Sequence, residues 1–202
     1  MTNLSPSYDN KIARKYSIKT LEHKLQNKTA LQEELGWPAE KKMPILCIPT
    51  GMSENLGGEL LKDVLPGLMT LGMEILILGK GSNEYGELFT KLTKENGHRI
   101  SIIKDDDEGK RKMYAAADIA LFFTEPSKLT ELQDALNYGV VPIAPTTKAL
   151  KNYNPIQENG NSFLYDQLNK WHCFAATVRA LETQCFPFDW RTIQRSCMES
   201  AK

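Results

Sequence analysis

The chain has 202 residues, 41% of them hydrophobic, and its 25 basic and 25 acidic side chains give a formal net charge of zero. This length and apolar content allow one large domain or two small ones with a real core. The balanced charge and the lack of an apolar run near the ~20 residues of a membrane span argue against nucleic-acid and membrane partners.

Residues 1–18 are polar and have few apolar positions, so we expect an extended arm or an interdomain linker there. Residues 19–202 make up the predicted domain. Residues 19–35 open it with leucines at helical spacing, and Gly36 is the expected stop signal.

Six apolar runs predict β-strands, and helical patterns separate them. The runs cover residues 44–49, 73–78, 99–103, 119–123, 140–144 and 162–165. Strands that alternate with helices favour a parallel sheet covered on both faces. The predicted fold class is therefore α/β, a single Rossmann-like three-layer domain with a mostly parallel sheet of about six strands.

The longest predicted helix between these strands covers residues 54–71, with Ser53 as its N-cap. Near the end of the chain, a helix is expected over residues 168–181. Trp171, Phe174 and Val178 share one face of that helix, so we expect all three in the core.

The stretch from Asp118 to Pro145 reads as a strand, a polar elbow, a helix from Leu129 to Tyr138 and a second strand. Glu125 lies in the elbow, where a strand ends and a helix begins. Open α/β sheets bind ligands at such positions, and helix starts favour anions. On this pattern alone, Glu125 either serves a site or only complements the helix dipole.

Two glycine-containing turns and one acidic loop also follow predicted strands. Gly51 follows the first strand, and the Gly79–Lys80–Gly81 turn follows the second. Each turn either needs glycine for its backbone or approaches a phosphate. The acidic loop 105–108 either leads into a helix start or contacts ribose hydroxyls, and we favour the helix start.

The cysteines and histidines indicate neither disulfides nor a metal site. Cys47, Cys173, Cys185 and Cys197 are scattered without a C-x-x-C pair, and the three histidines lie in different predicted elements. The N-terminus also lacks the pattern of a secretory signal. We therefore expect a reducing, cytoplasmic location and no metal.

Three segments resemble one protein family. Residues 125–132 and 138–142 resemble the E-P-C-G-L-T-Q-L … Y-G-T-x-P run of bacterial glycogen synthases and plant starch synthases. Residues 27–36 resemble the N-K-x-x-L-Q-x-x-L-G segment that opens their C-terminal domain, and residues 113–118 resemble their I-Y-A-G-A-D. These enzymes are retaining glucosyltransferases with two Rossmann-like domains, so the resemblance implies one half of a GT-B fold.

The resemblance also implies a ligand and a set of site residues. The ligand would be ADP-glucose or UDP-glucose, used without a cofactor or metal to extend an α-1,4-glucan. Glu125 would lie beside the donor sugar as the family's donor-site glutamate. The implied nucleotide-sugar-binding positions are Thr50, Gly51, Asn55, Gly79, Gly81, Tyr114, Leu129 and Thr130.

The sequence departs from the family where charge and close backbone approach matter. The family loop after the first strand carries an arginine and a lysine that neutralise the leaving diphosphate. Thr50 and Asn55 stand at those positions here, and Lys128 replaces a family glycine. The α-glucan acceptor would also require an N-terminal domain that this segment does not resemble. We therefore expect no activity from this chain alone, and the alternative is a non-catalytic, degenerate Rossmann-like binding or assembly module.

Overall fold

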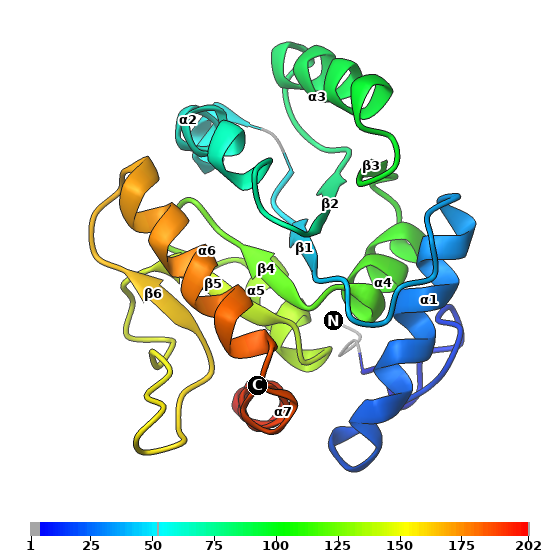
Figure 1. The fold of residues 1–202 in the computed structure, drawn as a ribbon, viewed down its shortest axis with the longest axis vertical. Helices are drawn as coiled ribbons and strands as arrows, with labels where there is room; N and C mark the ends of the chain where they lie inside the picture. Colours follow the sequence, from blue (N-terminus) through cyan, green and yellow to red (C-terminus); the bar gives the residue numbers. More distant parts are fainter. Residues whose placement is uncertain (1–4, 52, 202) are drawn as a thin grey trace.

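The computed structural model describes residues 5–51 and 53–201. Their six strands form one sheet in the order β3-β2-β1-β4-β5-β6, and every neighbouring pair is parallel (Figure 1). The strands are β1 (Ile45–Ile48), β2 (Glu74–Leu78), β3 (Ile100–Ile103), β4 (Ile119–Leu121), β5 (Val141–Pro145) and β6 (Phe163–Tyr165). This confirms the predicted α/β class. The strand order is that of Rossmann dinucleotide-binding domains, with a crevice expected where the order reverses.

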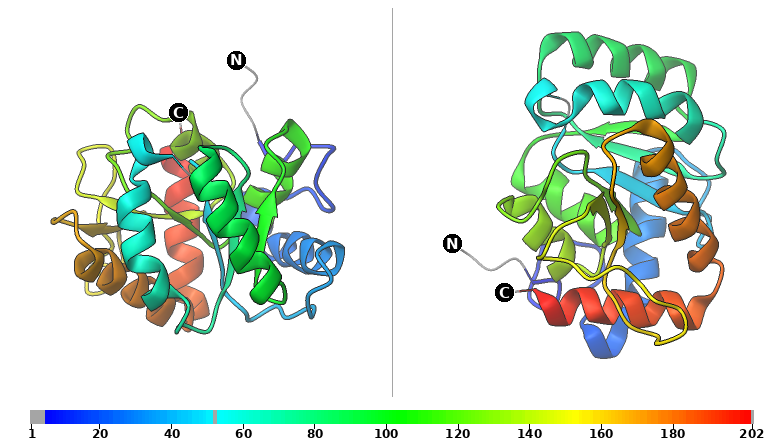
Figure 2. Two further views of the ribbon diagram at one scale, coloured as in Figure 1. Left: turned by 90° about the horizontal axis from the view of Figure 1, so that it is seen from above. Right: turned by 90° about the vertical axis from the view of Figure 1, so that its left-hand side faces the viewer.

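Helices flank the sheet on both faces, which is why every residue of β1, β2, β4 and β5 is buried. The α-helices are α1 (Lys24–Glu34), α2 (Gly58–Leu68), α3 (Asn83–Glu95), α4 (Asp107–Ala116), α5 (Thr130–Asn137), α6 (Lys170–Gln184) and α7 (Pro187–Ser200). Helix α1 packs beside α4, α2 beside α6, and α5 beside α7 (Figures 1 and 2).

The helix expected over residues 54–71 is shorter than predicted. A 3₁₀ turn, Glu54–Leu56, comes first, and α2 begins only at Gly58. Gly57 separates them with a φ of +90°, a left-handed conformation that interrupts a helix. Ser53 occupies the N-cap position of the 3₁₀ turn in an extended conformation, but its side chain makes no capping hydrogen bond.

The expected core face of α6 is partly wrong. Trp171 is 71% exposed, and Phe174 is only partly buried. The buried face of the helix instead consists of small side chains, namely Cys173, Ala176, Thr177 and Ala180. Small residues let α6 approach the sheet closely, and the large aromatic side chain is left outside.

Residues 27–36, which resemble the family segment, hold the amino end of the sheet together. Lys28 Nζ donates to Asp118 Oδ2 at 2.6 Å and to the Met43 carbonyl at 2.9 Å. The same Asp118 oxygen accepts the first backbone N–H of β1 at 2.8 Å. Gln32 Nε2 donates to Glu74 Oε2 at 2.8 Å. These residues therefore join α1 to the starts of β1, β2 and β4.

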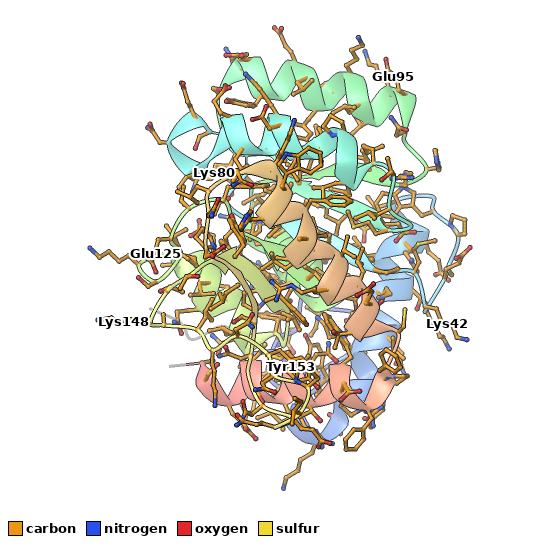
Figure 3. All side chains as sticks on the ribbon, turned by 60° about the vertical axis from the view of Figure 1, so that its left-hand side comes forward. Lys42, Lys80, Glu95, Glu125, Lys148 and Tyr153 are labelled. Atoms are coloured by element: carbon orange, nitrogen blue, oxygen red, sulfur yellow. The ribbon has the colours of Figure 1, made fainter. Side chains whose placement is uncertain are left out.

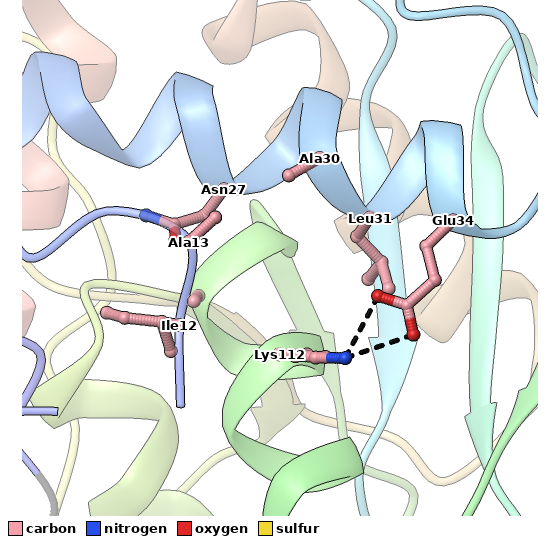
Figure 4. A pocket seen from close by; sticks show the side chains of 8 residues that line it. Ile12, Ala13, Asn27, Ala30, Leu31, Glu34 and Lys112 are labelled. Atoms are coloured by element: carbon pink, nitrogen blue, oxygen red, sulfur yellow. Dashed lines mark hydrogen bonds and ion pairs between the residues drawn. The ribbon is translucent and has the colours of Figure 1, made fainter. Parts of the chain in front are cut away.

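The predicted arm packs against the domain along residues 5–17, without forming a helix or strand. Ile12 and Tyr16 are buried, and the Tyr16 hydroxyl donates to the Tyr138 carbonyl at 2.8 Å. The Asn27 side chain bonds both the backbone N–H and the carbonyl of Arg14. Figure 4 shows this arm beside α1 and α4 over a small cavity of about 40 Å³.

Candidate functional site at the carboxyl end of the sheet

Three loops meet where β1, β2 and β4 end. A Cβ atom on Gly51 would lie 2.2 Å from the Lys80 carbonyl oxygen, and Gly51 also has a φ of +69°. A Cβ on Gly57 would lie 2.3 Å from Phe123 Cβ. The loop after β1 is therefore in close contact with the turn after β2 and with the end of β4. This is the crevice at which the strand order of the sheet reverses.

The Gly79–Lys80–Gly81 turn is anchored to β3 and reaches α5. The Gly79 N–H donates to the Ile103 carbonyl at 2.7 Å. Lys80 Nζ lies 3.5 Å from Glu131 Oε1 in the first turn of α5. A lysine from one loop thus stands beside the start of a helix from another.

Glu125 is exposed in the elbow after β4 and bonds locally. It accepts the Ser127 N–H at 3.2 Å and the Ser127 hydroxyl at 2.6 Å. The bonds from Ser127, then from the Thr147 hydroxyl, lower the pKa of Glu125 below its ordinary value. Glu125 is therefore a carboxylate at neutral pH, able to accept hydrogen bonds but unsuited to act as a general acid. Figure 3 shows Glu125 along one side of the molecule with Lys80 and Lys148.

The start of α5 is open to an anion. Leu129, the residue just before the helix, is in an extended conformation, and its apolar side chain makes no capping hydrogen bond. Thr130, the first helical residue, is exposed. The first N–H groups of a helix lack partners within the helix and carry partial positive charge. Next to Lys80, they form the strongest feature for binding a phosphate at this edge.

The implied site residues divide into exposed and buried groups. Asn55, Gly79, Gly81 and Thr130 are exposed, Leu129 is half-buried and Gly51 is buried. Thr50 is only 2% exposed, and its hydroxyl finds no hydrogen-bond partner among the described residues.

Tyr114 is also buried, at 1% exposure. Its hydroxyl donates to the Glu131 carbonyl at 3.4 Å. Burial raises the pKa of that hydroxyl well above its ordinary value. Tyr114 therefore supports the start of α5 from inside rather than facing solvent.

The acidic loop after β3 is explained by local structure. Asp106 caps α4 by accepting the Gly109 N–H at 2.8 Å. Lysines neutralise its neighbours, since Lys110 lies 2.6 Å from Asp105 and Lys112 lies 2.8 Å from Glu108. The interpretation as a helix start is confirmed.

The positive charge at this edge does not come from the two positions at which the resemblance implies cations. Residues 49–57 contain no lysine or arginine. The exposed cations of the adjoining loops are Lys80, Lys128 and Lys148.

In the described ranges, no cluster of three or more His, Cys, Asp or Glu side chains could hold a metal ion. Those ranges also contain no helix long and apolar enough to cross a membrane.

Comparison with known proteins shows which proteins this chain is similar to. The glycogen synthase of Clostridium perfringens is 33% identical over 203 residues, which cover 97% of this chain and 42% of that protein. The glycogen synthase of Fervidobacterium nodosum is 30% identical over 201 residues. The chain is a glycogen synthase-like glycosyltransferase domain. It corresponds to the C-terminal half of these enzymes and spans less than half of their length. No family model matches the chain.

Solved structures agree on the fold of this glycosyltransferase domain. The catalytic domain of starch synthase IV from Arabidopsis thaliana, bound to ADP and acarbose, superposes with a TM-score of 0.82 at 21% identity. The match covers 96% of this chain and 42% of that one. Anabaena HepE in complex with UDP and glucose gives a TM-score of 0.64 at 14% identity, over 87% and 47% of the two chains. The domain therefore has the architecture of one half of a GT-B fold.

Sequence reasoning missed two residues of this edge. Glu131 forms an ion pair with Lys80, and Phe123 packs on Gly57. The family-like pattern included Glu131, but nothing in the pattern indicated a partner some fifty residues away in the chain. Phe123 was assigned only to a buried strand.

Proposed function

We propose that this domain binds the diphosphate of a nucleotide sugar, ADP-glucose or UDP-glucose, at the carboxyl end of the sheet. The observation that supports it most is the uncapped start of α5 beside Lys80. A diphosphate there would receive helix N–H groups and an ammonium group together. The starch synthase IV complex with ADP and the HepE complex with UDP are consistent with this assignment.

Lys80 can serve as the phosphate cation because its present ion pair is loose. Its side chain is 48% exposed, and the contact with Glu131 is 3.5 Å long. A surface pair of this kind contributes about 0–1 kcal/mol, so Lys80 can leave Glu131 for a phosphate with little loss of stability. Glu125, as an exposed carboxylate, would accept hydrogen bonds from sugar hydroxyls.

In this proposal, transfer of glucose to an α-glucan requires more than this domain. The chain spans 42% of its first glycogen synthase relatives. We therefore propose that this domain supplies the donor side, and that acceptor groups come from the part of the enzyme that it does not match.

A second candidate is a non-catalytic binding or assembly module. Thr50 favours it, since the resemblance predicts an arginine there, and the residue present is buried with a hydroxyl that has no partner among the described residues. Without the two family cations, the leaving diphosphate would lose much of its electrostatic stabilisation.

Calorimetric titration with ADP, UDP, ADP-glucose and UDP-glucose tests the first candidate. We expect at least one of them to bind with a Kd at or below about 1 mM, which is roughly −4 kcal/mol. Lys80→Gln should weaken that binding about tenfold, because it removes a hydrogen bond to a charged group. Lys19→Gln, a change at an exposed lysine outside these loops, is the matched control.

Asn55→Lys then separates the two candidates. Asn55 is exposed, so a lysine fits there without entering the core. Restoring this family cation should tighten binding if the rest of the site is intact. If neither the wild-type chain nor Asn55→Lys binds any of the four ligands, the donor-side proposal is wrong. The non-catalytic binding or assembly module is then the candidate that the result supports.

A further inference from the structure

A groove of about 620 Å³ lies at the opposite, amino end of the sheet. Its walls come from the first helical segments of the domain and from the junction of α6 and α7. Lys42 lies just before β1 and Asp118 just before β4, so the groove lies at the amino ends of these strands. Figure 3 shows Lys42 on the side of the molecule away from Glu125. The groove is therefore separate from the candidate nucleotide-sugar site.

The groove concentrates positive charge in a chain whose net charge is zero. Among the described residues that line it, five are cationic, and they are Lys24, Lys28, Lys41, Lys42 and Arg191. Two lining residues, Glu22 and Asp118, are acidic, and Asp118 already accepts from Lys28 and from the Ile45 N–H. The exposed charges are then Lys41, Lys42 and Arg191 against Glu22, and a cleft with an excess of one sign of charge concentrates ions of the other sign.

The rest of the lining is largely apolar and includes one unsatisfied donor. Leu21, Leu25 and Pro187 line the groove together with Trp190. Trp190 is a buried residue, and its indole N–H is buried without an acceptor among the described residues. That N–H has almost no exposed surface, so what the groove offers a ligand is the apolar surface of these residues and not this donor.

We propose that this groove is a second binding site, which takes a small organic phosphate. The phosphate would lie among Lys41, Lys42 and Arg191, which are exposed. The ring or chain of the ligand would pack on the apolar lining. The volume falls in the range of roughly 300–1,000 Å³ that small-molecule sites occupy. Apolar walls with a few convergent charges are typical of such sites.

Lys24 would couple this binding to pH. Burial, the largest cause, lowers the pKa of Lys24 to about 7. A bound dianion would favour the protonated ammonium and raise that pKa. Binding should therefore be tighter at pH 7 than at pH 8.5, a range over which a phosphate monoester stays a dianion. The groups facing Lys24 are the hydroxyl of Tyr16, the carbonyls of Tyr114 and Ala115, and the side chains of Lys28, Asp118, Cys47 and Cys197.

The proposal is tested by titrating the chain with phenyl phosphate and measuring binding by NMR or calorimetry. Inorganic phosphate and phenol are the two half-ligands, and each should bind at least about tenfold more weakly than phenyl phosphate. The double variant Lys42→Gln/Arg191→Gln should weaken phenyl phosphate binding at least about tenfold. Both changes are at exposed positions, so circular dichroism should show an unchanged fold.

Lys80→Gln/Lys148→Gln is the matched control, because it removes two exposed cations at the other end of the sheet. If that variant abolishes phenyl phosphate binding and the groove variant does not, the ligand occupies the other site and the proposal is wrong. Equal affinity for inorganic and phenyl phosphate would overturn the role of the apolar lining. If phenyl phosphate does not bind at 10 mM, which corresponds to about −2.7 kcal/mol, the whole proposal is wrong.

Discussion

The two ends of the sheet handle their charged side chains in opposite ways. At the amino end, Lys28 and Asp118 are 2% and 8% exposed and lie 2.6 Å apart. At the carboxyl end, Lys80 and Glu131 are 48% and 19% exposed and lie 3.5 Å apart. Each member of the buried pair needs the other, because a lone buried charge is unstable. The open pair can exchange its partner, which is what a binding site requires.

Removing one buried partner should have the largest effect. Asp118→Ala should lower the free energy of unfolding by about 3–5 kcal/mol, since it leaves Lys28 buried without a counter-charge. Urea denaturation measures this change. Glu125→Ala, at an exposed carboxylate of the other end, should change stability by no more than about 0.5 kcal/mol. Equal losses for the two variants would remove the contrast between the ends.

The carboxyl end depends on backbone shape at Gly57. Gly57→Ala should cost about 2–3 kcal/mol, because an added Cβ both strains a φ of +90° and meets Phe123. Gly86→Ala is the matched control, since its Cβ would meet nothing within 4 Å on α3. That substitution should stabilise the chain by up to about 1 kcal/mol. Thermal or urea unfolding of the two variants side by side would show whether the loop contact is as tight as described.

Lys24 gives the amino end a pH dependence. Its pKa is about 7 in the folded protein, below its ordinary value. At a pH between these two values, Lys24 is protonated in the unfolded chain but largely neutral in the folded one. Stability should therefore rise with pH above about 7, by up to about 1.4 kcal/mol per pH unit. The clean window ends near pH 8.5, because burial raises the pKa of Cys47 to about 12, and this opposes the rise at higher pH.

Lys24→Met provides the comparison for this pH series. Urea denaturation at pH 7.0, 7.5, 8.0 and 8.5 should show a smaller slope for this variant than for the parent chain. An identical slope in both would mean that Lys24 keeps its proton in the folded protein throughout the window.

The smallest effect on stability is expected for the open pair. Lys80→Gln should change the free energy of unfolding by less than about 1 kcal/mol, because exposed ion pairs contribute little. Salt should weaken even that contribution. A loss of several kcal/mol would show that Lys80 holds the fold, and it would then be a poor candidate for a phosphate cation.

Local patterns predicted the strands well because buried parallel strands are continuous apolar runs. All six runs became strands of one parallel sheet. The start of α2 was less predictable, because Gly57 in a left-handed conformation delays the helix and is not visible as a break in hydrophobic periodicity. Helix α5, in contrast, begins one residue after its predicted start at Leu129.

Contacts between distant residues explain the remaining differences. Lys24 and Lys28 would be expected on the solvent face of a helix, yet both are buried by partners about ninety residues away. Likewise, Tyr114 matched a ligand-contacting segment by resemblance, while the structure buries it under α5. A sequence pattern shows which residue types are present, but not which loops approach one another.

The arm has a consequence for synthesis of the chain. Asp9 bonds to Tyr138, a residue 129 positions later, and Tyr16 bonds to the carbonyl of the same tyrosine. The arm can therefore make these two contacts only after a delay, once α5 and Tyr138 have been synthesised. At 5–20 residues per second, that delay is on the order of ten seconds. During that time Ile12 and Tyr16, which are buried in the folded domain, are accessible to chaperones.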